Sequence, residues 1–190
     1  MDKLPQPTSG ADELLALRCQ LGERAAFDEL IQHWAPPLRR YVLRMTGDGD
    51  AADDLMQEIW IAVIQGMARL REASKLRSWL FGIAHRVLTD RLRARYASPI
   101  DFDSDPPDGL SEDLHKEHEQ ERDEARKMVE SGLALMPLPE REVLTLFYLQ
   151  ELSLMEISSV ILVPVGTVKS RLFRARNLLR NRLFAQETMS

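Results

Sequence analysis

The chain has 190 residues, a net charge of −5 at pH 7 and 44% hydrophobic residues, which is typical of a globular protein with one large domain or two small ones. Its apolar runs are shorter than the roughly 20 residues that a membrane helix needs, and residues 1–10 lack the apolar core of a signal peptide. The single cysteine, Cys19, excludes an internal disulfide and a zinc-ligand set. We therefore expect a cytoplasmic protein without direct membrane insertion.

The charge is distributed unevenly along the chain. Residues 99–124 carry eleven acidic and two basic side chains, a local charge of −9, which leaves +4 for the rest of the sequence. Basic residues concentrate at 75–95 and at 164–184, and the second segment contains six of them and no acid. Such local concentration of positive charge favours a nucleic-acid partner, whatever the net charge of the chain.

Apolar residues recur at helical spacing throughout the chain, so we expect an all-α fold. A first helix is predicted at residues 12–34, capped by Ser9 or Asp12 and bent at Gly22. Its expected buried side consists of Leu14, Leu17, Leu21, Phe27, Leu30, Ile31 and Trp34. The pair Pro36-Pro37 should end this helix and start a short one at 38–45.

A turn at residues 46–50 leads into a helix at 50–65, for which Asp50 is the expected N-cap. A loop at 66–74 and a helix at 75–96 complete the first predicted domain, residues 12–96, which follows a tail at 1–11. Residues 97–121 are rich in Asp, Pro, Ser and Glu, and they contain too few apolar groups to offset the entropy of ordering. We therefore expect a flexible acidic linker there.

Helical periodicity resumes at about residue 122 and defines a second domain at 122–185, before a tail at 186–190. A helix at 140–149 precedes the capping box Ser153-Leu154-Met155-Glu156, which opens a short helix ending near Ile161. After a turn around 162–164, the last helix extends to about residue 184. Two short helices joined by a tight turn, the second of them basic, predict a helix-turn-helix.

One face of this last helix is expected to pack on its domain, namely Val165, Val168, Leu172, Ala175 and Leu179. Residues near the start of a recognition helix meet base edges. The candidates here are Lys169, Ser170, Phe173 and Arg174, whereas Arg171, Arg176 and Arg180 are expected to contact phosphates. The competing interpretation is a solvated basic helix at a protein–protein surface, but the preceding turn and capped helix favour DNA.

Two other helices leave alternatives open. Helix 75–95 mixes cations with rings at Arg77, Trp79, Phe81, His85 and Arg86, a pattern that suits single-stranded DNA. Its neighbours Leu80, Ile83, Ala84, Val87 and Leu88 are core residues, however, and Trp79 or Phe81 could join them, so spacing alone favours packing. Helix 50–65 carries a stripe of Asp53, Asp54, Gln57, Glu58 and Ile61. By itself this stripe indicates solvation rather than docking.

No pattern in the sequence indicates enzymatic chemistry. His115 and His118 lie in the acidic segment and are expected to be solvated, and Cys19 is expected to be a small buried residue. There is no nucleophile–base pair, no glycine-rich phosphate loop and no metal-ligand spacing. We therefore expect no catalytic residue, metal, cofactor or small-molecule substrate.

Several of these segments resemble the extracytoplasmic-function (ECF) sigma factors of the sigma-70 family. The run from Val165 to Arg176, Val-Gly-Thr-Val-Lys-Ser-Arg-Leu-Phe-Arg-Ala-Arg, resembles their recognition helix, and residues 139–144 resemble the start of the same region 4. Residues 47–58 resemble region 2.2, and residues 78–84 with 90–93 resemble regions 2.3 and 2.4. The resemblance covers about 12–96 and 125–185, and the order of the motifs around an acidic linker is specific.

The resemblance implies partners and roles. In this family region 2.2 docks on the β′ clamp helices of bacterial core RNA polymerase, which implicates Asp53, Asp54, Gln57, Glu58 and Ile61 and overrides the expectation of solvation. Regions 2.3 and 2.4, with the loop at 66–74, open and read the promoter −10 element as a single strand, and region 4 reads the −35 element as a duplex. The implied −10 residues are Arg71, Lys75, Arg77, Trp79, Phe81, His85, Arg86 and Arg93.

An anti-sigma factor commonly holds family members inactive, and one anchored in the membrane would keep this chain there indirectly. The acidic linker is further expected to thread toward the polymerase active-site channel. Two departures from the family pattern stand out: Arg86 replaces a common Asn, and Leu162 and Pro164 replace the turn glycine and cap serine. Because leucine disfavours a positive φ, we expect the turn to be reshaped.

Two other functions remain open from sequence. One is a self-sufficient helix-turn-helix regulator that binds duplex DNA as a dimer. The other is a sigma mimic that titrates an anti-sigma factor. Neither explains helices 50–65 and 75–95 together.

Overall fold

The computed structural model describes residues 10–97 and 129–187, and within these it describes side chains for 10–94 and 129–181. The N-terminal half contains α1 (Gly10–Gln20), α2 (Arg24–Thr46), α3 (Gly49–Gly66), the 3₁₀ turns η1 (Met67–Arg69) and η2 (Ala73–Lys75), and α4 (Leu76–Ala97). The C-terminal half begins with helical residues 129–134 and continues with α6 (Leu138–Leu144), the π-helical turn η3 (Thr145–Leu149), α7 (Leu154–Ile161) and α8 (Val165–Glu187). The described residues contain no strand, which confirms the all-α prediction. Apart from Ala97, the predicted linker lies outside them.

The prediction that Pro36-Pro37 end a helix is wrong, because α2 continues through both prolines to Thr46. A proline inside a helix lacks one hydrogen-bond donor and its ring crowds the preceding turn, at a cost of about 3 kcal/mol. The apolar side chains nevertheless keep one helical face on both sides of the pair. That buried face consists of Leu30, Trp34, Leu38, Tyr41, Val42 and Met45. Its burial offsets the cost of the two prolines.

The predicted first helix is in fact two, separated at Gly22, whose φ of 78° breaks the helical path. The predicted buried face of α1 is also wrong. Leu14, Leu17 and Leu21 are exposed, by 58%, 46% and 87%, while the buried apolar side chains of α1 are Leu15, Ala16 and Cys19. Ile31 on α2 is also exposed, by 36%, whereas Leu30 and Trp34 are buried as predicted. The break at Gly22 lets α1 rotate relative to α2, so a periodicity counted across both helices selects the wrong face.

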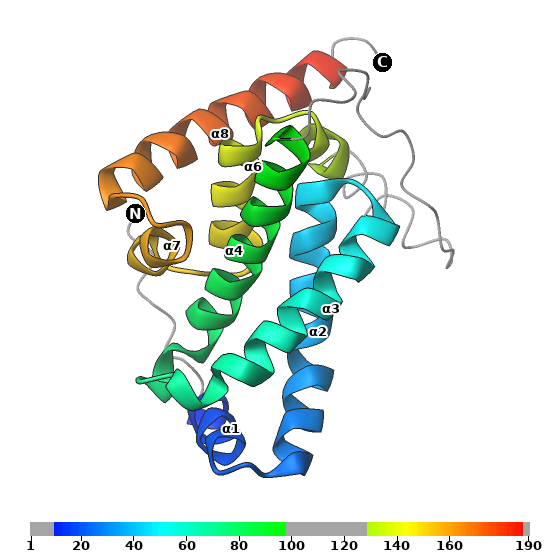
Figure 1. The fold of residues 1–190 in the computed structure, drawn as a ribbon. Helices are drawn as coiled ribbons and strands as arrows, with labels where there is room; N and C mark the ends of the chain where they lie inside the picture. Colours follow the sequence, from blue (N-terminus) through cyan, green and yellow to red (C-terminus); the bar gives the residue numbers. More distant parts are fainter. Residues whose placement is uncertain (1–9, 98–128, 188–190) are drawn as a thin grey trace, which may run out of the picture.

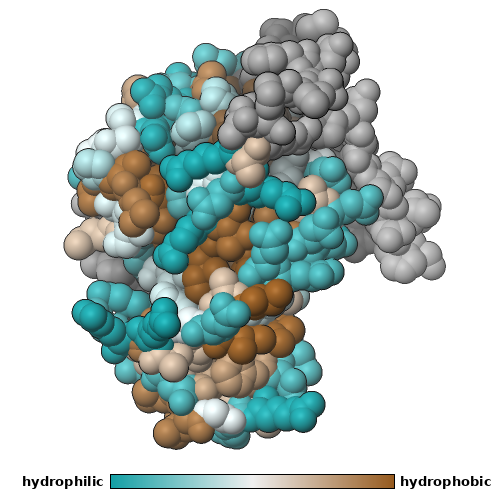
Figure 2. Space-filling model, viewed as in Figure 1, coloured by the Kyte–Doolittle hydropathy of each residue, from teal (hydrophilic) through white to brown (hydrophobic). Residues whose placement is uncertain are grey.

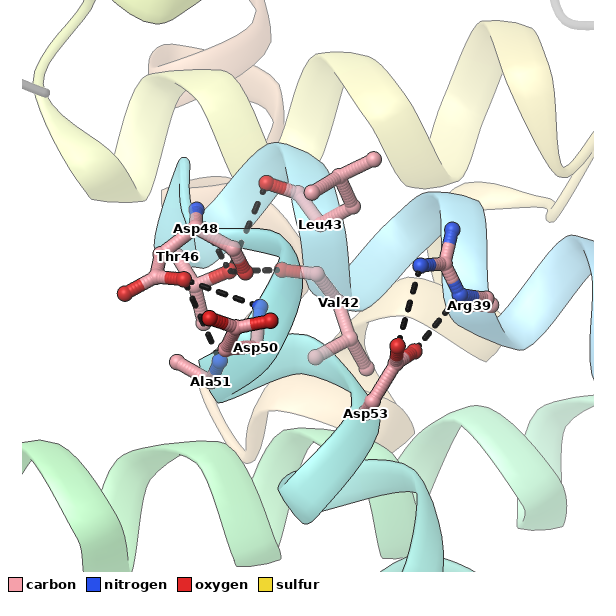
Figure 3. Close-up of polar contacts among 8 residues, drawn as sticks. All are labelled: Arg39, Val42, Leu43, Thr46, Asp48, Asp50, Ala51 and Asp53. Atoms are coloured by element: carbon pink, nitrogen blue, oxygen red, sulfur yellow. Dashed lines mark hydrogen bonds and ion pairs between the residues drawn. The ribbon is translucent and has the colours of Figure 1, made fainter. Parts of the chain in front are cut away.

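The turn from α2 to α3 corrects the predicted N-cap (Figure 3). Gly47 takes a φ of 70° and donates its N–H to the Leu43 carbonyl, which ends α2. Asp48, not Asp50, caps α3, since its Oδ1 accepts from the Asp50 and Ala51 amides at 2.9 and 3.2 Å. The Thr46 hydroxyl bonds to the Val42 carbonyl at 3.1 Å. These contacts fix the angle at which α3 leaves α2.

The two halves pack on one another and share a buried core. One continuous cluster includes Leu38 and Phe81 from the N-terminal half together with Val143, Leu146 and Ile157 from the C-terminal half. In Figure 1, α4 lies in the middle, with α2 and α3 on one side and α6 and α7 on the other. The face viewed there is mostly hydrophilic and carries an apolar area framed by polar side chains (Figure 2). We call this arrangement of the two halves the closed form.

Candidate nucleic-acid and polymerase interfaces

The helix-turn-helix of the C-terminal half is built by local caps. The Ser153 side chain accepts from the Glu156 amide, and the Glu156 carboxylate accepts from the Ser153 amide at 2.8 Å, so the predicted capping box is confirmed. Leu162 ends α7 in the left-handed region at φ 55°, ψ 42°. The expected reshaping of the turn is therefore wrong. The leucine adopts the glycine-like conformation, and its side chain is 80% exposed, so only the strain of its own Cβ against the backbone opposes this conformation.

Pro164 immediately precedes α8, and its carbonyl accepts the first helical hydrogen bonds from Thr167 and Val168, at 2.8 and 3.1 Å. Of the predicted packing face, Val168, Leu172 and Ala175 are buried at 4% exposure or less, while Val165 and Leu179 are half-buried. This anchoring turns the opposite face outward. The outward-facing candidates are Lys169, Ser170, Phe173, Arg174, Arg176 and Arg180, while Arg171 is half-buried. Phe173 is 65% exposed on this face, so its ring is accessible to a ligand.

Two arginines on α8 are held by other parts of the C-terminal half. The Arg174 Nε donates to Oε1 of Glu140 at 3.0 Å; the glutamate side chain is only 10% exposed, whereas that of Arg174 is 59% exposed. The Arg176 guanidinium lies over the Phe147 and Tyr148 rings, at 5.6 and 5.5 Å from their centroids. Both cations are thereby oriented before any ligand binds, which lowers the entropy cost of using them.

The candidate residues on α4 and the loop before it form three groups: exposed cations, aromatic rings packed in or against the core, and two residues that face the C-terminal half. Arg71, Lys75, Arg86 and Arg93 are exposed. Phe81 is fully buried and makes edge-to-face contacts with Trp34 and Tyr41, so its ring is a core residue in the closed form. Trp79 is half-buried against Gly66. The core residues predicted around them, Leu80, Ile83, Ala84 and Leu88, are buried, and Val87 is partly buried.

The third group, Arg77 and His85, faces the C-terminal half. Arg77 lies over the Trp34 ring at 5.9 Å and donates to the Gln150 carbonyl at 3.5 Å. His85 Nδ1 lies 2.7 Å from Oε1 of Glu142, and the same oxygen accepts from the Tyr41 hydroxyl at 2.5 Å. Burial of the Tyr41 phenol beside this carboxylate raises its pKa well above the ordinary value, so the hydroxyl keeps its proton and donates.

Further polar contacts join the two halves around Arg44. Its guanidinium pairs with both carboxylate oxygens of Glu130, and both side chains are largely buried. Its backbone carbonyl accepts from Arg141 at 3.0 Å, and Arg141 also bonds to the Met136 carbonyl at 2.9 Å. Burial lowers the pKa of the Arg141 guanidinium. Together with the hydrogen bonds of Glu142 to Tyr41 and His85, these contacts give the closed form a specific geometry, which apolar packing alone does not.

The acidic stripe of α3 is exposed along its whole length. Asp53, Asp54, Gln57, Glu58 and Ile61 all face outward. Arg39 on α2 donates to both oxygens of Asp53, at 2.7 and 3.3 Å (Figure 3), and this bond lowers the pKa of the Asp53 carboxyl. Arg91 lies 3.5 Å from Glu58. Ile61 and Ile64 expose 56% and 54% of their surface, so the stripe combines acids with apolar groups, as a docking surface does.

The described residues offer little to other kinds of chemistry. No group of three or more His, Cys, Asp or Glu side chains among them is placed to hold a metal ion. Within the same residues, no helix is both long and apolar enough to cross a membrane. Cys19 is buried, as predicted, and burial raises the pKa of its thiol. His115 and His118 lie outside the described residues.

The sequence did not predict the residues that hold the candidate site residues in place by hydrogen bonds. Arg39, Glu140 and Glu142 each contact a predicted site residue from another element, 14, 34 and 57 positions away along the chain. A single sequence carries no signal for such contacts. Glu140 and Glu142 did stand inside the segment matched to region 4 by resemblance, but nothing in their spacing indicated that they would be buried.

Comparison with known proteins identifies both halves. Residues 30–97 match the family model for sigma-70 region 2, and residues 126–179 match that for sigma-70 region 4, so α1 precedes the matched segments. The RNA polymerase sigma-H factor of Pseudomonas aeruginosa is 31% identical over 180 residues, covering 90% of this chain and 93% of that protein. The ECF RNA polymerase sigma-E factor of Escherichia coli K12 is 30% identical, with 90% and 94% covered.

Two solved structures share the fold. CnrH, in complex with the cytosolic domain of CnrY, has a TM-score of 0.67 at 24% identity, covering 92% of this chain and 98% of that one. The sigma factor RpoE from Bartonella quintana, in complex with the anti-sigma factor NepR, has a TM-score of 0.62 at 23% identity, with 83% and 96% covered. The sequence relationships extend over nearly the whole chain, and both regions occur in the expected order. The chain therefore belongs to the ECF sigma factors of the sigma-70 family, which are non-enzymatic factors of transcription initiation.

Proposed function

We propose that this sigma factor binds bacterial core RNA polymerase through the exposed stripe of α3. The stripe offers carboxylates next to two exposed isoleucines on a rigid helix, and Arg39 holds Asp53 in one orientation. The partner surface on the β′ clamp helices would supply cations to the acids and apolar contact to Ile61. Like the other four candidates, Asp54 is exposed, and it lies next to Asp53 in the stripe.

For promoter DNA, we infer that α8 reads the −35 element as a duplex. The observation that carries this proposal is the outward face of α8, where Phe173 and several cations are exposed while the apolar face is buried. With its Nε bound to Glu140, Arg174 keeps its two terminal nitrogens for a base edge, and guanine O6 and N7 accept such a pair. Lys169 and Ser170 start the same face, and Arg171, Arg176 and Arg180 are assigned to phosphates.

The −10 element, we propose, binds as a single strand along the loop at 66–74 and the residues from Lys75 through α4. Arg71, Lys75, Arg86 and Arg93 supply exposed positive charge, and the half-buried Trp79 supplies a ring. Arg77 and His85 join this surface only after the C-terminal half moves away, because in the closed form they bond to Gln150 and Glu142. Phe81 supports the surface from the core.

Regulation by an anti-sigma factor is the remaining part of the proposal. It is supported by CnrH and RpoE, whose solved structures are complexes with CnrY and with the anti-sigma factor NepR. An anti-sigma factor that stabilises the closed form would keep Arg77 and His85 covered. A membrane-anchored one would also hold this cytoplasmic protein at the membrane.

The decisive experiment is in vitro transcription with purified core polymerase on a genomic library, with mapping of the start sites. We expect transcripts that depend on this chain and share two upstream elements. No transcripts would refute the proposal, and duplex DNA binding without core by a dimer would favour a self-sufficient regulator. A sigma mimic would bind an anti-sigma factor but start no transcripts.

The docking surface has its own test. Asp54→Ala should weaken binding to core polymerase and leave the melting temperature unchanged, because Asp54 is exposed. Asp28→Ala removes an equally exposed carboxylate from α2 and serves as the matched control. Equal core affinity for the two variants would count against docking through α3.

A further inference from the structure

The loop between α3 and α4 needs support from elsewhere in the molecule. It consists of two 3₁₀ turns, η1 and η2, which have poorer hydrogen-bond geometry than an α-helix and are stable only as short pieces. Several of its side chains, including Arg69, Arg71 and Lys75, are exposed. A loop that must present cations to a single strand binds more tightly when its backbone is already ordered.

The end of α1 supplies such support through Gln20. Its side-chain Nε2 donates to the Leu70 carbonyl at 2.6 Å and to the Met67 carbonyl at 3.3 Å. The Leu70 amide bonds back to the same Met67 carbonyl at 3.1 Å, closing η1. One amide group, partly buried, thus ties both ends of the turn to α1. Leu15 and Cys19 pack in the same core cluster as Met67 and Leu70, which fixes α1 beneath the loop.

The other side of the loop is held by α4. A Cβ placed on Gly66 would lie only 3.1 Å from Cζ2 of Trp79, so the ring packs directly against the backbone where the loop begins. The loop is therefore in contact with Gln20 of α1 on one side and with Trp79 of α4 on the other. Of these two supports, the one on α1 lies outside the segment that matches sigma-70 region 2.

We propose that Gln20 is a positioning residue for −10 recognition: through its two hydrogen bonds to the Met67 and Leu70 carbonyls, it holds the loop at 66–75 in the shape that receives the single strand. This inference rests on the proposed −10 function of the loop. Gln20 itself touches no DNA in this scheme, since its amide points into the turn. Its effect is on the backbone that carries Arg71.

The most informative substitution is Gln20→Glu, which keeps the shape of the side chain and replaces the donor by a carboxylate facing two carbonyl oxygens. Gln65→Glu is the matched control, because it adds the same charge at an exposed position close to the loop. Gln20→Lys is the rescue, since an ammonium group can again donate to both carbonyls, and Gln65→Lys, which adds the same positive charge without that contact, shows how much of any recovery is attraction to phosphates. The probe is a fluorescein-labelled single-stranded oligonucleotide with the −10 sequence of a promoter mapped with the wild-type holoenzyme.

We expect Gln20→Glu holoenzyme to bind the probe about tenfold more weakly, as the loss of two ordinary hydrogen bonds implies, and to discriminate less between bases at one position. Gln65→Glu should bind almost as the wild type does, Gln20→Lys should recover most of the affinity, and duplex −35 binding should be unchanged in all variants. Amide hydrogen exchange of residues 67–72 should accelerate in Gln20→Glu alone.

Three results would overturn the inference. One is an equal loss in Gln20→Glu and Gln65→Glu, which would be a charge effect. Another is a loss of −10 and −35 binding in the same proportion, following the melting temperature, which would be a general loss of stability. The third is faster loop exchange with unchanged probe binding. Failure of the wild-type holoenzyme to bind the probe would instead refute the proposed −10 function, and the exchange data would still report on the contact.

Discussion

Replacing Glu142 with alanine should open the closed form. Oε1 of Glu142 accepts from both Tyr41 and His85 across the boundary between the halves, and the Tyr41 hydroxyl is fully buried. Each hydrogen bond to a charged group contributes about 1.5–3 kcal/mol, and part of this is offset because the carboxylate is no longer desolvated. The net shift is about 3 kcal/mol toward a form in which the two halves have separated, the open form, or about a hundredfold in the ratio of closed to open molecules.

Energy transfer between dyes on introduced cysteines measures this shift. Gln65→Cys on α3 and Asn181→Cys on α8 place one label on each half, in a Cys19→Ala background that removes the buried native thiol. Glu142→Ala should lower transfer efficiency and increase the affinity of the free protein for a single-stranded −10 oligonucleotide. Glu13→Ala, which removes an exposed carboxylate on α1, should change neither quantity. Unchanged transfer in Glu142→Ala would refute the assignment of Glu142, Tyr41 and His85 as a major contact among those that keep the halves together.

The other predictions concern single residues. Arg174→Ala should weaken −35 binding by about 1–3 kcal/mol and relax specificity at one base pair in a competition assay, whereas an equal loss on all sequences would indicate a phosphate contact. Leu162→Gly should raise stability to urea by about 0.5–1 kcal/mol, because glycine accepts φ 55° without strain and the leucine side chain is exposed; a lower midpoint would contradict this. The raised pKa of Tyr41 means that the unfolded chain loses this proton first, near pH 10, so stability is complete below that pH and declines as the pH rises above it. Melting curves should show a shallower alkaline decline for Tyr41→Phe, and parallel curves would mean that the phenol does not titrate differently in the two states.

Much of the fold was predictable because its signals are local. The capping box at Ser153 and Glu156 lies within four residues, and the buried face of α8 follows one uninterrupted helical period. Errors arose where a local signal had to be weighed against distant packing. Pro36-Pro37 predict a stop, yet the apolar face that continues beyond them is buried against other helices and keeps α2 intact.

In the candidate site, too, local features were predictable from sequence and contacts between distant residues were not. The exposed cations of α8 were predictable, since a buried stripe at helical spacing determines which residues face outward. The position of Phe81 was not, because an aromatic residue among cations looks the same in sequence whether it faces DNA or the rings of Trp34 and Tyr41. The contacts of Gln20 and Glu142 were also beyond reach, because each joins elements that are brought together only by the complete fold.

The closed form affects the two proposed DNA-reading surfaces differently. On α8, the contacts that hold Arg174 and Arg176 come from Glu140, Phe147 and Tyr148 within the same half, so they persist when the halves separate. On α4, the hydrogen bonds of Arg77 to Gln150 and of His85 to Glu142 come from the other half and must be broken before these side chains meet a single strand, whereas the contact of Arg77 with the Trp34 ring stays within its own half. On the proposed assignments, opening would therefore change −10 recognition and leave the orientation of the −35 arginines, Arg174 and Arg176, unaltered. Any ligand that binds only the closed form would consequently inhibit capture of the melted strand more strongly than binding of the upstream duplex.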